Sequence, residues 1–154
     1  DAYVSLMADA ILPFVADKHG LELNPDRTAV MGSSMGGLMS LYALGQRPEV
    51  FETAIAFSTH WPFGCNDLVN ELTELLPDAA SHRIWTDTGT IELDQYYAPF
   101  HKAAVEKIQA RGYSEPDSLV AATYPNTGHH ESYWARRVAD ALNWWLRAPD
   151  RDQG

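Results

Sequence analysis

The stretch Gly32-Ser33-Ser34-Met35-Gly36 contains the residue of this chain that is best placed to act as a nucleophile. The apolar run 28–31 precedes it and a helix-forming run, 38–44, follows it, as in a Gly-x-Ser-x-Gly elbow between a strand and a helix. Such a turn strains the serine backbone and projects Oγ beyond the strand end, while its glycines let the two backbones pass closely. The pattern predicts Ser34 as the nucleophile; the alternative is an ordinary Gly/Ser turn.

An oxyanion formed at such a serine is stabilised by the N-terminus of the helix that follows, through free N–H groups and the positive end of the helix dipole. The residue after the nucleophile supplies the first of these groups, so we expect the N–H of Met35 to be one oxyanion donor. A second donor normally comes from a loop after an earlier strand, and this sequence shows no such strand.

A serine hydroxyl needs a base to remove its proton, and histidine is the natural base near neutral pH. Three of the six histidines follow directly after predicted strands, namely His60, His129 and His130. A histidine between the last strand and the last helix gives the chain order serine, acid, histidine that a known class of triads uses. His129 fits this position, the residues alone leave His130 open as the base, and we expect His60 to line the pocket.

The loop after the third predicted strand offers three carboxylates that could orient the imidazole: Asp87, Glu92 and Asp94. Asp87 stands at the end of the strand, where we expect a structural role. Glu92 and Asp94 lie where the loop can reach the histidine, although an aspartate at position 94 could instead cap a helix. We predict Asp94 as the acid and keep Glu92 as the second choice.

The elements that must position these residues alternate along the chain between short β-rich runs and amphipathic helical runs, which predicts an α/β fold. We expect four parallel strands, over residues 28–31, 53–58, 83–87 and 118–124, with helices over residues 2–19, 36–46, 67–75, 94–111 and 131–147. Right-handed crossovers would bring the loops that carry Ser34, the acid and the histidine to one edge of the sheet.

Helical spacing places apolar side chains on one face of the first and of the last predicted helix. The first helix carries Tyr3, Met7, Ile11 and Phe14 on one face, should be kinked by Pro13, and should end at Gly20. The last helix carries Trp134, Val138, Leu142 and Trp145 at helical spacing, and we expect these side chains to belong to the core.

Composition limits the function classes. The 154 residues suit one domain, and a net charge of −10 argues against nucleic acid or an anionic membrane as a partner. Cys65 is the only cysteine and the histidines show no ligand spacing, so we expect no disulfide, no metal site and no cofactor. The single cysteine and the lack of a signal peptide favour a cytoplasmic location, although the start at Asp1 could be a cut point.

Several of these segments resemble the "Putative esterase" branch of the α/β-hydrolases, which includes enterochelin and feruloyl esterases. The resemblance covers nearly the whole chain and rests on residues 32–43, 47–51, 58–62, 87–94 and 129–134. In that family a tryptophan commonly follows the catalytic histidine by five positions, which implies His129, with Trp134, rather than His130.

The sequence departs from that family at its front, because the four strands and the oxyanion loop that precede the first helix in the family are absent. The resemblance therefore implies a truncated α/β-hydrolase-like domain over residues 1–154, the C-terminal half of the usual fold, with helices on both faces of the sheet. The nucleophile strand becomes an exposed edge, and open edges pair with other strands. We expect a homodimer joined through this edge, in which the second copy could supply the missing N–H group.

Together, the residues and the resemblance predict a serine carboxylic-ester hydrolase that acts on a small-molecule ester through an acyl-enzyme. Ser34 would attack, His129 would move the proton, Asp94 would orient the histidine, and Met35 would stabilise the oxyanion. His60, Trp61 and Phe63 are expected to form part of the pocket, with packing as the alternative for the two aromatic residues. The alternative functions are an acyltransferase with the same triad and a non-catalytic remnant used for binding or assembly.

Overall fold

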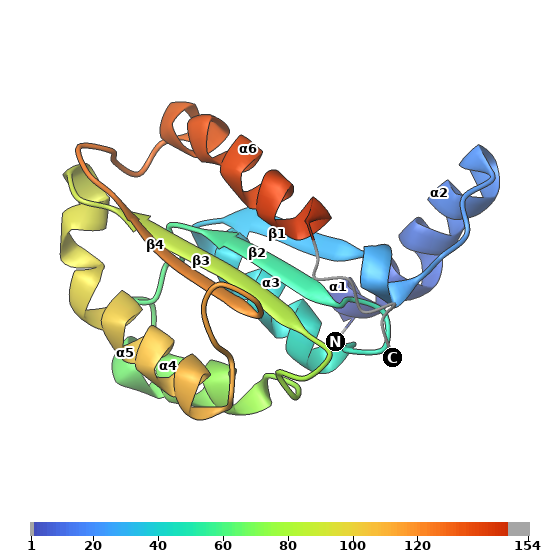
Figure 1. The fold of residues 1–154 in the computed structure, drawn as a ribbon, viewed down its shortest axis with the longest axis horizontal. Helices are drawn as coiled ribbons and strands as arrows, with labels where there is room; N and C mark the ends of the chain where they lie inside the picture. The colour runs from blue at the N-terminus through green and yellow to red at the C-terminus, as the bar shows by residue number, and fades with distance from the viewer. Residues whose placement is uncertain (1, 148–154) are drawn as a thin grey trace.

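A four-stranded parallel sheet forms the centre of the protein in a computed structural model that describes residues 2–147 (Figure 1). Its strands lie in chain order: β1 (Ala29–Ser33), β2 (Thr53–Phe57), β3 (Arg83–Gly89) and β4 (Leu119–Tyr124). The predicted α/β fold is confirmed. Strand β1 extends two residues further than predicted and so reaches Ser33, directly before the proposed nucleophile.

Helices cover both faces of this sheet, as predicted. Helices α3 (Met35–Gln46), α4 (Cys65–Leu75) and α5 (Ala98–Ala110) connect consecutive strands and share one face, whereas α6 (Glu131–Leu146) lies on the other (Figure 1). Neighbouring parallel strands joined by right-handed crossovers have their connecting helices on the same side. The carboxyl ends of all four strands consequently point toward one edge.

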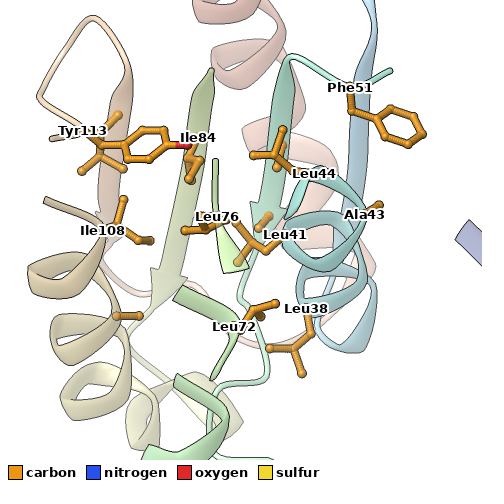
Figure 2. Packing of buried hydrophobic residues seen from close by; sticks show 14 of the residues in the cluster. Leu38, Leu41, Ala43, Leu44, Phe51, Leu72, Leu76, Ile84, Ile108 and Tyr113 are labelled. Atoms are coloured by element: carbon orange, nitrogen blue, oxygen red, sulfur yellow. The ribbon is translucent and has the colours of Figure 1, made fainter. Parts of the chain in front are cut away.

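Two cores hold these layers together. The larger core lies between the sheet and helices α3 to α5 and includes Leu41, Leu44, Ile84 and Ile108, which converge in Figure 2. The smaller core joins the opposite face to α6 and contains Ile55, Phe57, Trp85 and Ala141, with Trp134, Val138 and Trp145 packed against it. Each fully buried aliphatic side chain contributes roughly 1.5–3 kcal/mol, so the layers are fixed mainly by apolar burial.

The segment before β1 differs from the single kinked helix that the sequence predicts. It consists of α1 (Ala2–Ser5), a π-helical segment η1 (Leu6–Ile11) and α2 (Leu12–His19), followed by a 3-10 turn η2 (Pro25–Arg27). The irregular turns directly precede Pro13, which stands in the first turn of α2, where its missing N–H costs little. Gly20 ends α2 in the left-handed conformation, as predicted.

The apolar face expected on this segment is only partly buried. Val4 and Ala8 belong to the larger core, whereas Tyr3, Ile11 and Phe14 are exposed. The physical reason is that α2 extends away from the sheet (Figure 1), which leaves Phe14 and Val15 exposed.

Strand β1 is an outer strand of the sheet. It pairs with β2 from Ala29 opposite Thr53 to Ser33 opposite Phe57, and no other described strand lies beyond it. The side chain of Met31, in the middle of this edge, is 49% exposed. Among the described residues, β1 therefore forms an edge of the sheet, as predicted for the strand before Ser34.

Candidate active site

Ser34 occupies the sharp turn between β1 and α3. Its backbone angles are φ 57° and ψ −119°, in a region that a residue with a side chain rarely adopts and that costs on the order of 1–3 kcal/mol. Two of its backbone hydrogen bonds connect it to the end of β2 and the loop that follows: the Ser34 N–H donates to the Phe57 carbonyl at 2.9 Å, and the His60 N–H donates to the Ser34 carbonyl at 3.2 Å. The β2 strand end thus braces the strained turn.

The close backbone passage expected at this turn depends on Gly32 and Gly37. A Cβ at Gly32 would lie 2.4 Å from the Gly36 carbonyl oxygen, and one at Gly37 would lie 2.8 Å from Thr59 Oγ1. A Cβ at Gly36 would meet no atom within 4 Å. Of the two glycines in the Gly-x-Ser-x-Gly motif, only Gly32 has no room for a side chain, because it faces the first turn of α3.

Ser34, His129 and Asp94 form a continuous chain of hydrogen bonds. The Ser34 Oγ lies 2.8 Å from His129 Nε2, although the two residues are 95 positions apart. His129 Nδ1 lies 2.6 Å from Asp94 Oδ1. The side chain of His129 is 12% exposed and that of Asp94 is completely buried. This is the geometry that a serine, its base and an orienting acid require.

The second oxygen of Asp94 is equally well bound. Asp94 Oδ2 accepts a hydrogen bond from the Gly89 N–H at 2.6 Å and one from Ser58 Oγ at 2.5 Å. Burial alone would raise the pKa of Asp94, but the hydrogen bonds from His129, Ser58 and Gly89 hold it below its ordinary value. Asp94 is thus kept as a carboxylate.

The helix-cap role left open for Asp94 is wrong. Residues Glu92–Tyr96 form a 3-10 turn, η3, and α5 begins only at Ala98. The side chain of Asp94 points into the site instead of back to the helix, because its oxygens are occupied by Gly89, Ser58 and His129. Glu92, the second choice for the acid, is exposed.

Asp87 and Arg137 form a buried ion pair beneath this chain, and the sequence analysis missed Arg137. Asp87 Oδ1 accepts from Arg137 Nη1 at 2.8 Å, and Oδ2 accepts from Trp85 Nε1 at 3.1 Å. Burial raises the pKa of Asp87 despite the opposing effect of Arg137. Arg137 stands three residues after Trp134, on the apolar stripe of the last helix. A charged residue within such a stripe was the available signal.

Aromatic rings enclose His129. Its ring lies 5.3 Å from that of Tyr97, 4.9 Å from that of Trp134 and 6.3 Å from that of His60, measured between centroids. Trp134 therefore contacts the proposed base as well as the core to which the sequence assigned it. His60 Nδ1 is hydrogen-bonded to the Tyr97 hydroxyl. Burial, and the charge of His129 when protonated, lower the pKa of His60, which favours its neutral form.

The remaining residues that the sequence placed near the site are either packed in the core or exposed at the surface. Trp61 is completely buried in the larger core, which agrees with the packing alternative. Phe63 is exposed, with its ring centroid 6.4 Å from that of His60. His130, the alternative base, is exposed and caps α6, because its Nδ1 accepts from the Ser132 N–H at 3.2 Å. His130 therefore lies outside the hydrogen bonds that join Ser34, His129 and Asp94.

Met35 is the first residue of α3, where backbone N–H groups have no partner within the helix. An apolar hollow of about 260 Å³ begins at this residue and lies between α3 and α4. Its lining residues are Met35, Leu38, Met39, Tyr42, Phe63, Leu68 and Leu72. The hollow is thus next to Ser34 in the chain and reaches Phe63, which neighbours His60.

Among residues 2–147, histidine, cysteine and carboxylate side chains nowhere gather in a group of three that could hold a metal ion. Within the same residues, no helix has the length and apolar character needed to cross a membrane.

The family described as "Putative esterase" matches residues 1–145 of this chain. The chain belongs to this esterase family. Its α/β-hydrolase fold is shared with solved esterases. A structure of the Shigella flexneri enterobactin esterase with enterobactin has a TM-score of 0.77 at 22% identity over 94% of this chain and 36% of that one. A ferulic acid esterase has a TM-score of 0.73 at 15% identity over 94% and 60%, respectively.

Curated relatives are similarly longer than this esterase-family chain. It is 22% identical over 149 residues to the uncharacterized protein YbbA of Bacillus subtilis, covering 92% of this chain and 58% of that protein. It is 30% identical over 80 residues to the siderophore enterobactin esterase of Emericella nidulans, covering 52% and 26%, respectively. The chain thus spans little more than half the length of YbbA and about a quarter of the siderophore esterase.

Proposed function

We propose that this esterase-family chain hydrolyses carboxylic esters, with Ser34 as nucleophile, His129 as base and Asp94 as acid. The observation that carries the proposal is the continuous hydrogen bonding from Ser34 Oγ through both nitrogens of His129 to Asp94. The strained backbone of Ser34 supports it further, because strain of this kind is maintained at reactive turns.

In the proposed reaction Ser34 Oγ attacks the acyl carbon while His129 Nε2 takes its proton. The carbonyl oxygen becomes an oxyanion near the N–H of Met35. Collapse of this intermediate breaks the ester bond, and His129 gives its proton to the departing alkoxide. Water then attacks the acyl-enzyme, His129 takes a proton from it and returns that proton to Ser34 Oγ, which releases the carboxylic acid.

The hollow between α3 and α4 supports an apolar acyl or alcohol group as part of the substrate. Its lining is almost entirely hydrocarbon and sulfur, so a substrate group bound there would gain free energy by leaving water. His60 and Phe63 would lie between this hollow and His129. The preferred substrates would then be small esters with an apolar chain or ring.

Labelling with a fluorophosphonate probe, together with hydrolysis of p-nitrophenyl esters from acetate to decanoate, tests the proposal. The wild type should be labelled at Ser34 and turn over esters, and Ser34→Ala should lose both activities. If Ser34→Ala hydrolyses esters as fast as wild type, the proposed triad is refuted. Absence of labelling in folded wild type would favour a non-catalytic remnant, and an ester product in the presence of added alcohol would favour acyl transfer.

The choice of acid is tested by a matched pair of amide variants. Asp94→Asn should lower kcat by roughly 10³–10⁴, because an amide can hold the imidazole in the wrong tautomer and cannot stabilise its positive form. Glu92→Gln, which neutralises a nearby exposed carboxylate, should leave kcat close to that of wild type. The reverse result would assign the acid to Glu92.

We also infer that a second copy of the chain pairs with the exposed edge of β1. Open strand edges bind other strands, and the apolar side chains of Met31, Ile11 and Phe14 are exposed on or before this strand. A neighbouring strand would also lie on the side of Ser34 where a second oxyanion donor is expected. Loss of one such donor typically lowers the rate by about 10²–10³, so pairing would accelerate the reaction.

A further inference from the structure

A buried cluster of charges lies directly behind the proposed triad. Asp87 and Asp94 are completely buried and Arg137 is 1% exposed. Two carboxylates and one guanidinium leave one formal negative charge in the cluster. The imidazolium that would form when Ser34 gives up its proton carries the opposite charge.

Ser58 connects the two carboxylates. Its Oγ accepts a hydrogen bond from Arg137 Nη1 at 3.0 Å and donates to Asp94 Oδ2, while its N–H donates to Asp87 Oδ1 at 3.0 Å. The residue is completely buried and has a positive φ of 40°. Ser58 therefore contacts Asp87, Arg137 and Asp94 at the same time and links the ion pair to the carboxylate of the triad.

The guanidinium is shared unequally between the carboxylates. Arg137 Nη1 lies 2.8 Å from Asp87 Oδ1, whereas Arg137 Nη2 lies 3.9 Å from Asp94 Oδ2. Arg137 therefore neutralises mainly Asp87, and the charge of Asp94 is left to interact with His129 at 2.6 Å.

We propose that Asp87 and Arg137, linked to the triad by Ser58, are positioning residues that set the proton affinity of His129 and so the lower pH limit of activity. Neither side chain reaches the reacting atoms, and both act through Asp94. This inference rests on the proposed ester hydrolysis, in which only neutral His129 can accept the serine proton.

Other polar or titratable groups also face His129 or its partners, and the test leaves all of them unchanged. Tyr97 and His60 approach the imidazole from the turn before α5 and the loop after β2. Buried His101, on α5, interacts with the charge of Asp94. Beside His129 in the chain, the exposed side chains of His130 and Glu131 lie 3.6 Å apart.

Removing the two charges separately should shift activity in opposite directions. Asp87→Asn leaves Arg137 free to neutralise Asp94, so the imidazolium is less favoured and the acid limb of kcat/KM should move to lower pH. Arg137→Met removes the positive charge and should move the limb to higher pH. Each shift should be on the order of half a pH unit or more, because the charges act within a poorly solvated interior.

The double variant Asp87→Asn/Arg137→Met removes both charges and should return the limb close to its wild-type position. Arg137→Met alone leaves Asp87 as an unpaired buried charge, which can prevent folding. The double variant contains no such charge and therefore keeps the test valid in that case. Asp67→Asn is the matched control: it removes one negative charge from an exposed position on α4, across the sheet from α6, and should leave the limb in place.

Titration of the His129 ring by NMR provides a readout that does not require turnover. Opposite shifts in the two single variants, in both NMR and kinetics, would support the proposal. An unchanged titration in folded Asp87→Asn would overturn it, as would shifts of the same sign in both variants. If the NMR shifts occur as expected but the protein has no esterase activity, the proposed function is refuted. The proposed effect of Asp87 and Arg137 on His129 then still stands.

Discussion

Asp94 shows how the residues around a carboxylate, more than its place in a loop, determine what it can do. Its two oxygens accept hydrogen bonds from His129, Ser58 and the Gly89 N–H, and all three favour the ionised form. Glu92, two positions earlier, is exposed to solvent. The side chain suited to orient the histidine is therefore the one whose charge the protein has already stabilised.

His101 should make the stability of the protein depend on pH. Burial lowers the pKa of His101 from 6.5 to about 4, and its Nδ1 has no hydrogen-bond partner. Between these two values the unfolded chain binds a proton that the folded chain does not, so stability is present above pH 6.5 and is lost as the pH falls toward 4.

Urea unfolding at pH 7 and pH 4.5 measures this contribution. The loss of unfolding free energy on acidification should be smaller in His101→Leu than in wild type by about 2 kcal/mol. His19→Leu, which replaces an exposed histidine, is the control for the substitution itself. Equal losses in wild type and His101→Leu would mean that His101 is protonated in the folded state.

Residue types and their order along the chain made Ser34, His129 and Asp94 candidates, because each follows a predicted strand. They left His130 and Glu92 open as alternatives, and the preference for His129 came from the family resemblance. Ser58 and Arg137 could not be selected in this way. Their contacts join residues 36 and 50 positions apart, which become neighbours only when the strand ends meet at one edge and α6 packs on the sheet. Trp134 was assigned to the core alone because helical spacing cannot distinguish a core contact from a contact with His129.

At the scale of elements, the turn between β1 and α3 depends on close contact of two backbones. Gly32→Ala should destabilise the protein by several kcal/mol, because its Cβ would overlap the Gly36 carbonyl and backbone cannot move aside easily. Gly36→Ala should instead raise stability by about 0.5–1 kcal/mol, since it adds an alanine to a helix where there is space.

Chemical unfolding of both variants, with circular dichroism as the readout, checks this contrast. The two substitutions are chemically identical and four positions apart in one motif, so each serves as the control for the other. Equal destabilisation by both would contradict the described passage of β1 and α3.

The succession of elements followed from hydrophobic periodicity, whereas their boundaries did not. Apolar runs located all four strands, and amphipathic spacing located α3, α4 and α6 within a few residues. The π-helical turns of η1 and the 3-10 turn η3 were missed. Both replace predicted regular helix. In η3, Asp94 binds Gly89 of β3 and Ser58, directly after β2, instead of capping α5.

At the scale of the whole molecule, the exposed edge of β1 and the apolar side chains of α2 should promote association. Light scattering of the wild type at micromolar concentration should give the mass of a dimer. Met31→Lys should give a monomer, because lysine on an edge strand opposes pairing with another strand. Leu146→Lys, at an exposed position near the end of α6, is the control and should remain dimeric. A monomeric wild type would contradict the inferred pairing.

The outermost position of β1 has a consequence for how substrate preference can change. On one flank of Ser34 the boundary is built from α3, α4 and the loop after β2, all of which belong to the described chain. On the opposite flank the boundary consists of whatever polypeptide occupies the strand edge. In the inferred dimer that polypeptide is a second copy, so substitutions on the copy's facing surface, outside the surroundings of the nucleophile, would also alter the alcohol or acid that the proposed esterase accepts.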